Sequence, residues 1–186
     1  MAVSALMHSI AIRPYRVSDA HDVYAAISES IEQMSRWMPW CQSSYSVHDA
    51  LNWLVEQESC RDRGTAYEFA ITGPDGGYLG GCGINQVNRE YRLANLGYWV
   101  RSSATGRGIA AHAVELVTQW TFANTDLLRL ELVIAVDNQR SIRVAEKVGA
   151  VYEGVARSRL LLRQQPTDAL MYSIIRADVA GGISGY

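Results

Sequence analysis

The sequence has few cysteines and no long apolar run, and both absences exclude classes of protein. Its three cysteines, Cys41, Cys60 and Cys82, are an odd number at wide spacing, so they predict neither a disulfide framework nor a zinc site. No apolar stretch is long enough to span a bilayer, and the first residues lack the basic start of a signal peptide. We therefore expect a cytoplasmic protein with no membrane partner.

An excess of charge of one sign is also lacking. The chain has 17 Lys and Arg against 19 Asp and Glu, which gives a net charge of -2. Broad nucleic-acid binding needs a dense basic face, so we expect no nucleic-acid partner. The four histidines are scattered at spacings that fit no metal site, so we expect no metal. The length of 186 residues and the hydrophobic content of 48% are typical of one globular domain.

Strand and helix patterns alternate along the whole chain. A strand at residues 9–14 ends at Pro14, and a helix follows from Ser18 or Asp19 to about Ile31. Residues 46–49 resemble a capping box that begins a second helix, to about residue 61. The remaining elements are strands at 66–72, 78–87 and 93–100, a helix from 109 to about 124, a strand at 128–136, a short helix to 148, and strands at 151–162 and 169–176. This order predicts one α/β domain with a mixed sheet at residues 9–178, an N-terminal extension at 1–8 and a tail at 179–186.

The clearest functional signal is the glycine turn, which we define as residues 105–110 (Thr-Gly-Arg-Gly-Ile-Ala). It joins a predicted strand to a predicted helix. The first turn of a helix has amide protons without internal partners and carries the positive end of the helix dipole, so it attracts an anion such as a pyrophosphate. Gly106 and Gly108 lack a Cβ and allow a phosphate to approach the backbone. Taken alone, this spacing favours the alternative interpretation, a plain tight connection.

The glycine turn matches neither of two common phosphate-binding motifs. It lacks the Gly-Lys-Ser/Thr ending of the Walker motif, and Ala111 stands where the dinucleotide fingerprint has its third glycine. It resembles instead the coenzyme-A loop of GNAT acyltransferases, Arg/Gln-x-x-Gly-x-Gly/Ala, with Thr105 in place of the Arg or Gln that steadies the loop. Five other stretches resemble the RimJ/RimL-type branch, the N-terminal acetyltransferases of ribosomal proteins: residues 36–40, 96–100, 137–149, 153–155 and 172–176.

This resemblance extends from residue 12 to residue 176 and has implications for fold and chemistry. It implies a single-domain GNAT fold, with a mixed, mostly antiparallel sheet of about seven strands flanked by helices. It also implies acetyl-CoA as co-substrate and direct attack by a primary amine in a ternary complex. Enzymes of this branch are often dimers, so a homodimer is a further expectation.

The resemblance implies cofactor-binding residues in three segments. A backbone amide at the end of the fourth strand, that of Trp99 or Val100, is the expected donor to the thioester oxyanion. Asn138 by itself predicts a helix cap, and the resemblance adds contact with the pantetheine arm. Ser141 is implied as the donor of a proton to the leaving thiolate, because Ala145 stands where many relatives have tyrosine. The full implied set is Trp99, Val100, Thr105, Gly106, Arg107, Gly108, Ile109, Ala110, Asn138, Ser141 and Arg143.

The sequence indicates the acceptor-binding residues less clearly than the cofactor-binding residues. Trp37 and Trp40 are candidates for the wall of an acceptor pocket that stacks on a cation, although core packing is the alternative. Tyr98 is a third candidate, or simply a sheet residue. An alkylammonium of pKa about 10 must lose a proton before it attacks. Glu68 is the candidate catalytic base, with a solvent-facing strand residue as the alternative, and Asn95 stands where many relatives carry an acid.

The acceptor itself stays open at this stage. It is either a protein N-terminus, as in ribosomal-protein acetyltransferases, or a small amine such as an antibiotic or an aminoacyl compound. A non-catalytic acyl-CoA sensor and a plain nucleotide-phosphate binder are alternatives of other classes.

Overall fold

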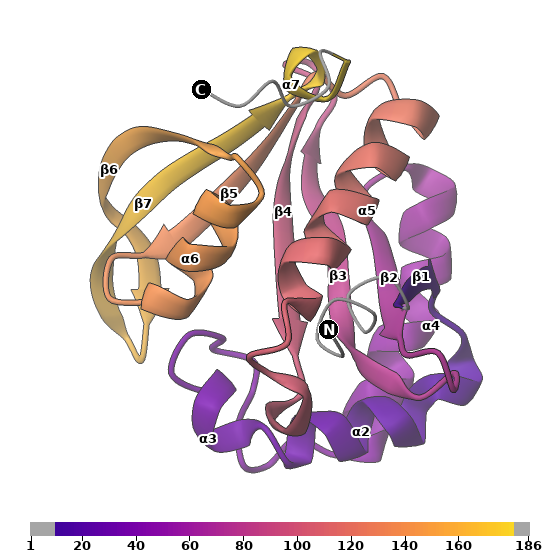
Figure 1. The fold of residues 1–186 in the computed structure, drawn as a ribbon. Coiled ribbons are helices and arrows are strands. Elements are labelled where there is room, and N and C mark those ends of the chain that lie inside the picture. The colour runs from indigo at the N-terminus through magenta and orange to yellow at the C-terminus, as the bar shows by residue number, and fades with distance from the viewer. Residues whose placement is uncertain (1–9, 181–186) are drawn as a thin grey trace, which may run out of the picture.

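Seven strands form one sheet in the order β1-β2-β3-β4-β5-β7-β6 (Figure 1). The computed structural model describes residues 10–180, so the predicted extension at 1–8 and residues 181–186 of the predicted tail lie outside the described residues. Every strand pairing is antiparallel except that of β4 with β5. The predicted α/β fold with a mixed, mostly antiparallel sheet of seven strands is confirmed.

The elements follow one another in the predicted order. The strands are β1 (Ala11–Pro14), β2 (Tyr67–Thr72), β3 (Tyr78–Asn88), β4 (Leu93–Val100), β5 (Arg129–Ala135), β6 (Val151–Leu162) and β7 (Gln165–Ile175). The helices are α2 (Ala20–Ser28), α3 (Ile31–Met34), α4 (Val47–Arg63), α5 (Ile109–Asn124), α6 (Gln139–Lys147) and α7 (Arg176–Ala180), with 3-10 turns η1 (Val17–Asp19) and η2 (Ser102–Ala104).

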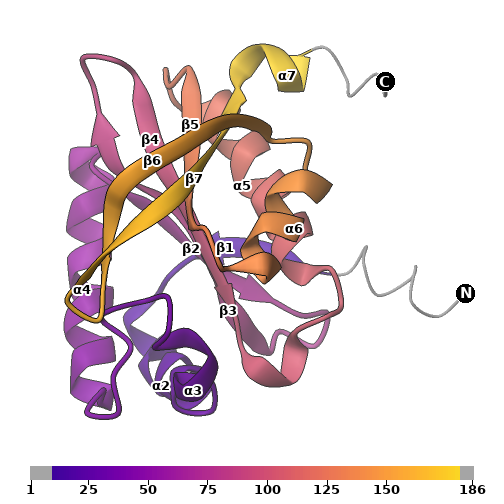
Figure 2. The ribbon, with the colours of Figure 1, turned by 90° about the vertical axis from the view of Figure 1, so that its left-hand side faces the viewer.

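The sheet separates two layers of helices. Helices α5 and α6 cover one face, and α2 and α4 cover the other (Figure 2). Successive side chains of a strand point to opposite faces, and β2 shows the result. Its Phe69 and Ile71 join the apolar cluster under α5, whereas Ala70 joins the cluster under α2 and α4. Glu68, two residues from Ala70, therefore lies on the α2 and α4 face.

The predicted first helix is interrupted before Ile31. Helix α2 ends at Ser28, and α3 begins at Ile31. The hydroxyl of the buried Ser30 donates to the Ala26 carbonyl at 2.6 Å. Side-chain bonds of this kind compete with the regular helix ladder, and we attribute the interruption to this bond.

Two boundaries near the C-terminal end also differ from the prediction. Strand β7 begins at Gln165 rather than at residue 169, because β6 and β7 form a tight hairpin that pairs Leu162 with Gln165. Val179 and Ala180, which we assigned to the tail, are the last residues of α7.

Candidate active site

Strands β4 and β5 separate after three residue pairs. Residues 93–95 of β4 pair with residues 129–131 of β5, whereas β4 stays paired with β3 as far as Val100. Beyond Asn95 the two strands diverge (Figure 1). We call the space between them the splay gap, and the edge of β4 that faces it has no strand partner there.

Backbone N–H groups of β4 point into the splay gap. The Arg101 N–H donates to the Leu79 carbonyl at 2.9 Å, and hydrogen bonding alternates along an antiparallel pair. The N–H groups of Tyr98 and Val100 therefore point away from β3, while that of Trp99 points toward it. Of the two predicted oxyanion donors, Val100 is the one whose amide faces the gap.

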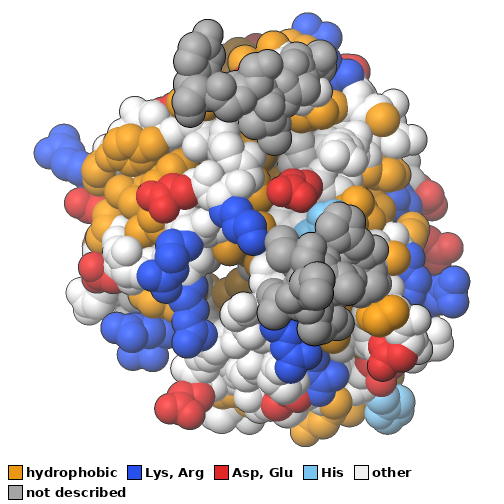
Figure 3. Space-filling model, in the orientation of Figure 1, with side chains coloured by type: hydrophobic (Ala, Val, Ile, Leu, Met, Phe, Trp, Pro, Cys, Tyr) orange, Lys and Arg blue, Asp and Glu red, His pale blue; other side chains and the backbone are white. Residues whose placement is uncertain are grey.

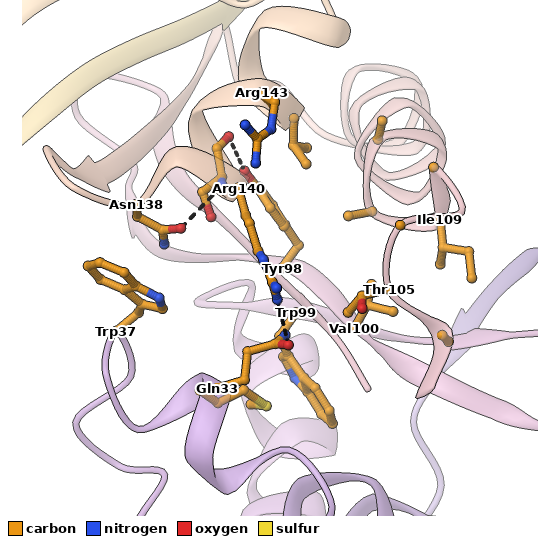
Figure 4. Close-up of a pocket in the computed structure, with 18 of the residues that line it drawn as sticks. Gln33, Trp37, Tyr98, Trp99, Val100, Thr105, Ile109, Asn138, Arg140 and Arg143 are labelled. Carbon is orange, nitrogen blue, oxygen red and sulfur yellow. Dashed lines mark hydrogen bonds between the residues drawn. The ribbon is translucent and has the colours of Figure 1, made fainter. Parts of the chain in front are cut away.

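A cavity of about 420 Å³ adjoins this edge of β4 (Figure 4). We call it the main cavity, and it lies between the end of β4, the glycine turn, α3 and α6. It brings together most residues that the sequence nominated: Trp37, Tyr98, Trp99, Val100, Thr105, Gly106, Gly108, Ile109, Ala110, Asn138, Ser141 and Arg143. Arg140, which the sequence analysis weighed beside Arg143 as a contact to coenzyme-A phosphates, also lines the cavity. The sequence analysis did not nominate the other lining residues, which include Gln33, Met34 and Met38 on or next to α3 and Val144 and Lys147 on α6.

The glycine turn has the predicted helix-start geometry. The first backbone bond of α5 runs from the His112 N–H to the Gly108 carbonyl at 3.1 Å, so the preceding N–H groups have no helical partner. Gly106 and Gly108 have φ values of 76° and 77°, a region that favours glycine. A Cβ at Gly106 would meet no atom within 4 Å, so the space above this residue is open to a ligand.

A carboxylate just after the end of α2 holds the segment that leads into the glycine turn. Glu29 accepts hydrogen bonds from the Ser103 N–H at 3.1 Å and from the Arg101 Nε at 3.1 Å. The Ser102 N–H donates to the Ser30 hydroxyl at 3.0 Å. The short side chain of Thr105 donates only to the nearby Ser102 carbonyl. Residues 29 and 30 therefore hold the segment before the glycine turn, and the Thr105 side chain reaches no farther than Ser102.

The start of α6 lies across the main cavity from the glycine turn. The Ser141 N–H donates to the Asn138 side-chain oxygen at 3.2 Å, which confirms the predicted cap. The Tyr98 hydroxyl donates to the Ser141 carbonyl at 3.1 Å. Burial raises the pKa of Tyr98 far above its ordinary value, so the phenol stays protonated. The Ser141 side chain is half-buried and lines the cavity.

Basic side chains of α6 border the cavity. Arg140, Arg143 and Lys147 line it, and the Arg140 guanidinium donates to Gln33 Oε1 at 2.6 Å (Figure 4). Figure 3 shows Lys and Arg side chains around the hollow near the centre of this face. Positive charge at a cavity attracts anionic ligands, so α6 adds electrostatic attraction to that of the helix start.

Three nominated residues lie elsewhere. Trp40 does not line the main cavity; it is 49% exposed and its ring centroid is 6.0 Å from that of Tyr45. Arg107 is exposed, and its guanidinium donates to the Ser103 carbonyl. Glu68 lies outside the lining of the main cavity, on the α2 and α4 face of the sheet. A role for Trp40 in acceptor binding stays a prediction without support from this placement.

Glu68 is half-buried rather than fully solvent-facing. Its side chain lies against the sheet, and its Oε1 accepts from Asn85 Nδ2 at 3.0 Å. Burial raises the pKa of Glu68 from 4.5 to about 7, although the Asn85 hydrogen bond and the charge of Arg61 oppose the rise. A carboxyl that titrates near neutral pH is suited to accept a proton at physiological pH.

Two negative findings hold for residues 10–180. In this range no cluster of three or more His, Cys, Asp and Glu side chains has the arrangement of a metal site. No helix of the same range has the length and apolar character needed to cross a membrane.

A splayed strand pair and an open helix start thus meet at the main cavity. A family model described as "Acetyltransferase (GNAT) domain" matches residues 9–151. The chain belongs to this GNAT family of N-acetyltransferases.

Individual relatives agree with this assignment. The chain is 29% identical to the probable N-acetyltransferase YjcK of Bacillus subtilis, over 91% of this chain and 96% of the relative. It is 24% identical to the ribosomal-protein-serine acetyltransferase of Escherichia coli, over 86% of this chain and 95% of the relative. The solved structure of Mycobacterium smegmatis RimJ in complex with CoA-disulfide superposes with a TM-score of 0.84 at 25% identity, covering 95% of this chain and 91% of that one.

Proposed function

We propose that this protein transfers an acetyl group from acetyl-CoA to a primary amine, by direct attack of the amine in a ternary complex. The observation that carries the proposal is the continuity of the main cavity, which joins the open helix start at Gly106 and Gly108 to the unpaired edge of β4. A diphosphate at one end and a thioester at the other fit these two kinds of donor.

Each part of the cavity has a role in this proposal. The glycine turn binds the diphosphate, and the basic residues of α6 add attraction. The pantetheine arm follows β4, with Asn138 beside it, and the N–H of Val100 stabilises the charge that develops on the thioester oxygen. Ser141 gives a proton to the departing thiolate. Trp37 and Tyr98 border the reacting end.

The acceptor in this proposal is a protein N-terminus or a small amine. The likeness to a ribosomal-protein-serine acetyltransferase supports the first, but a shared fold does not determine the acceptor. We therefore test both with one screen. Release of coenzyme-A thiol from acetyl-CoA is measured with N-terminal peptides of ribosomal proteins and with a panel of small primary amines.

A matched pair of glycine variants tests the diphosphate site. Gly106 and Gly149 both have positive φ, 76° and 71°, and a Cβ at either would meet no atom within 4 Å. Replacement by Ala therefore strains both backbones alike, but only Gly106 lines the main cavity. We expect Gly106→Ala to weaken coenzyme-A binding at least about tenfold more than Gly149→Ala, by calorimetry.

Two outcomes would contradict the proposal in different ways. Equal coenzyme-A affinity in the two glycine variants would show that the diphosphate does not bind at the glycine turn. Tight acetyl-CoA binding with no acceptor-dependent thiol release across the screen would identify an acyl-CoA sensor instead of an enzyme.

A further inference from the structure

Within residues 10–180, two side-chain hydrogen bonds cross the splay gap at its open end (Figure 4). The Tyr98 hydroxyl of β4 donates to the Ser141 carbonyl at 3.1 Å, and the Arg140 guanidinium donates to Gln33 Oε1 at 2.6 Å. Both bonds involve the start of α6, at consecutive residues. They therefore tie the helix that carries the proposed proton donor to the part of the molecule that carries the proposed oxyanion donor.

The closed end of the splay gap is fixed in a different way. There residues 93–95 of β4 pair with β5, and the Arg176 guanidinium donates to the carbonyls of Thr125 and Leu127 at 2.7 and 2.9 Å. Helix α6 follows β5 in the chain and lies beyond the paired residues. A small rotation about so short a strand ladder would move the start of α6 relative to β4, so the bonds at the open end determine its position.

The alternation of side chains along β4 directs Tyr98 toward α6. Leu96, Tyr98 and Val100 contact the apolar cluster on the face that α5 and α6 cover, whereas Trp99 packs against the cluster on the other face. Burial raises the pKa of the Tyr98 phenol above its ordinary value. The hydroxyl therefore remains a hydrogen-bond donor across the working pH range.

The backbone of Ser141 is held at both of its polar atoms. Its N–H donates to the Asn138 side-chain oxygen at 3.2 Å, and its carbonyl accepts from Tyr98. A helical carbonyl also accepts from the N–H four residues later, and its second lone pair is free for the phenol. The Ser141 hydroxyl itself makes no hydrogen bond with a described residue. Its proton is therefore available to a ligand in the main cavity.

The two bonds across the open end differ in their exposure to water. The bond between Arg140 and Gln33 is exposed, so water competes with it and the ordering of two long side chains offsets much of its contribution. The bond from Tyr98 to Ser141 is partly buried, and shielding from water strengthens a hydrogen bond. Tyr98 is therefore the stronger tie between β4 and α6.

We propose that Tyr98 is a positioning residue for proton transfer: by holding the Ser141 carbonyl, it fixes the Ser141 hydroxyl relative to the Val100 N–H across the splay gap. This inference rests on the proposed function, in which Ser141 protonates the departing sulfur and the Val100 N–H stabilises the thioester oxygen. The sulfur and the oxygen are bonded to the same carbon, so their two donors must keep a fixed separation. A displacement of about 1 Å can lower the rate by about 100-fold.

The first test is a double-mutant cycle of Tyr98→Phe and Ser141→Ala, with the amine that the acceptor screen identifies. Tyr98→Phe keeps the ring and leaves the Ser141 carbonyl its helical partner, so the variant should fold. We expect Tyr98→Phe alone to lower kcat about tenfold and to change the acetyl-CoA KM less than about threefold. In the Ser141→Ala background the same replacement should change kcat less than about twofold, because Tyr98 acts through Ser141.

Tyr152→Phe is the matched control for this cycle. Tyr152 is 51% exposed on β6 and lies outside the lining of the main cavity, so its replacement should leave kcat at the wild-type value. Effects of Tyr98→Phe and Ser141→Ala that multiply in the double variant would overturn the inference, because Tyr98 would then act without Ser141. The proposed function would still stand in that case.

The second test follows the start of α6 directly and needs no turnover. The N–H groups of Ser141 and Ile142 donate to the side-chain oxygen and the carbonyl of Asn138, so their exchange with solvent reports how firmly this turn is held. We expect NMR to show both amides exchanging about fivefold faster in Tyr98→Phe than in the wild type, with exchange in β2 unchanged. Unchanged exchange at both amides would overturn the inference even if no acceptor had been found.

Discussion

Glu29 accepts hydrogen bonds from both the N–H and the hydroxyl of Ser103, at 3.1 and 2.8 Å. The two residues are 74 positions apart in the sequence, and their contact fixes the segment before the glycine turn to the end of α2. The pKa of Glu29 is lowered to about 2, chiefly by its hydrogen bond with Arg101, so this carboxylate is ionised across the working pH range.

Replacement of Glu29 should make the glycine turn less ordered. Glu29 has no proposed contact with the reacting atoms, so the proposed chemistry keeps all of its groups. We expect Glu29→Ala to raise the acetyl-CoA KM about tenfold and to change kcat less, because the glycine turn must then be ordered by the ligand itself. Glu58→Ala, on the exposed surface of α4, is the matched control. Steady-state kinetics with varied acetyl-CoA check this, and an unchanged KM would show that the loop is ordered without Glu29.

Replacement of Ser141 by Ala separates chemistry from binding. We expect kcat to fall by about 10- to 100-fold, with coenzyme-A affinity changed less than threefold, because the cap bond at this position uses the backbone N–H of Ser141. Calorimetry and thiol-release kinetics on the same preparation check both numbers. Wild-type turnover would leave the Tyr98 hydroxyl, which donates to the Ser141 carbonyl, as the next candidate proton donor.

The raised pKa of Glu68 should make the folded state less stable as pH rises. Between 4.5 and about 7 the folded protein binds this proton and the unfolded chain does not, so the free energy of unfolding falls across that window. The loss is about 3 kcal/mol, since each pKa unit is worth about 1.4 kcal/mol. Urea denaturation at pH 5 and pH 8 should show this fall in the wild type, and the fall should be absent in Glu68→Gln.

The basic residues of α6 should act mainly through charge. We expect Arg143→Gln to weaken coenzyme-A binding about three- to tenfold at low salt, and the difference from wild type to shrink at 0.5 M salt because screening shortens the range of the attraction. Arg159→Gln, on the exposed part of β6, is the control with the same charge change. A deficit that persists at high salt would indicate a direct hydrogen bond instead.

Local chemistry explains what the sequence predicted well. The glycine turn and the Asn138 cap depend on residues within three or four positions of one another, where glycine's freedom and asparagine's hydrogen bonding decide the conformation. These signals sufficed for the order of the elements along the chain, and the family resemblance added most of the residues that line the main cavity.

Contacts between distant segments explain what the sequence did not predict. The support of Glu29 for the loop, and the hydrogen-bonded series from Glu68 through Asn85 to Asn95, depend on strand register and on how α2 packs. A change of register by one residue would move each of these side chains to the opposite face. Trp40 is a residue that the sequence nominated and the structure places elsewhere. Its residue type gives no indication that its side chain lies away from the main cavity.

Within residues 10–180, three residue pairs of one ladder join the β1–β4 part of the sheet to the β5–β7 part, and this ladder is the shortest between strands of the described sheet. Helix α5 packs on the first part and α6 on the second. A ligand that contacts both helices therefore adds contacts between the two parts that the strand ladder does not provide. In the protein without ligand, local opening at the β4–β5 ladder should cost less free energy than opening elsewhere in the sheet. Amide exchange near residues 93–95 should then slow more than exchange in β2 when coenzyme A is added.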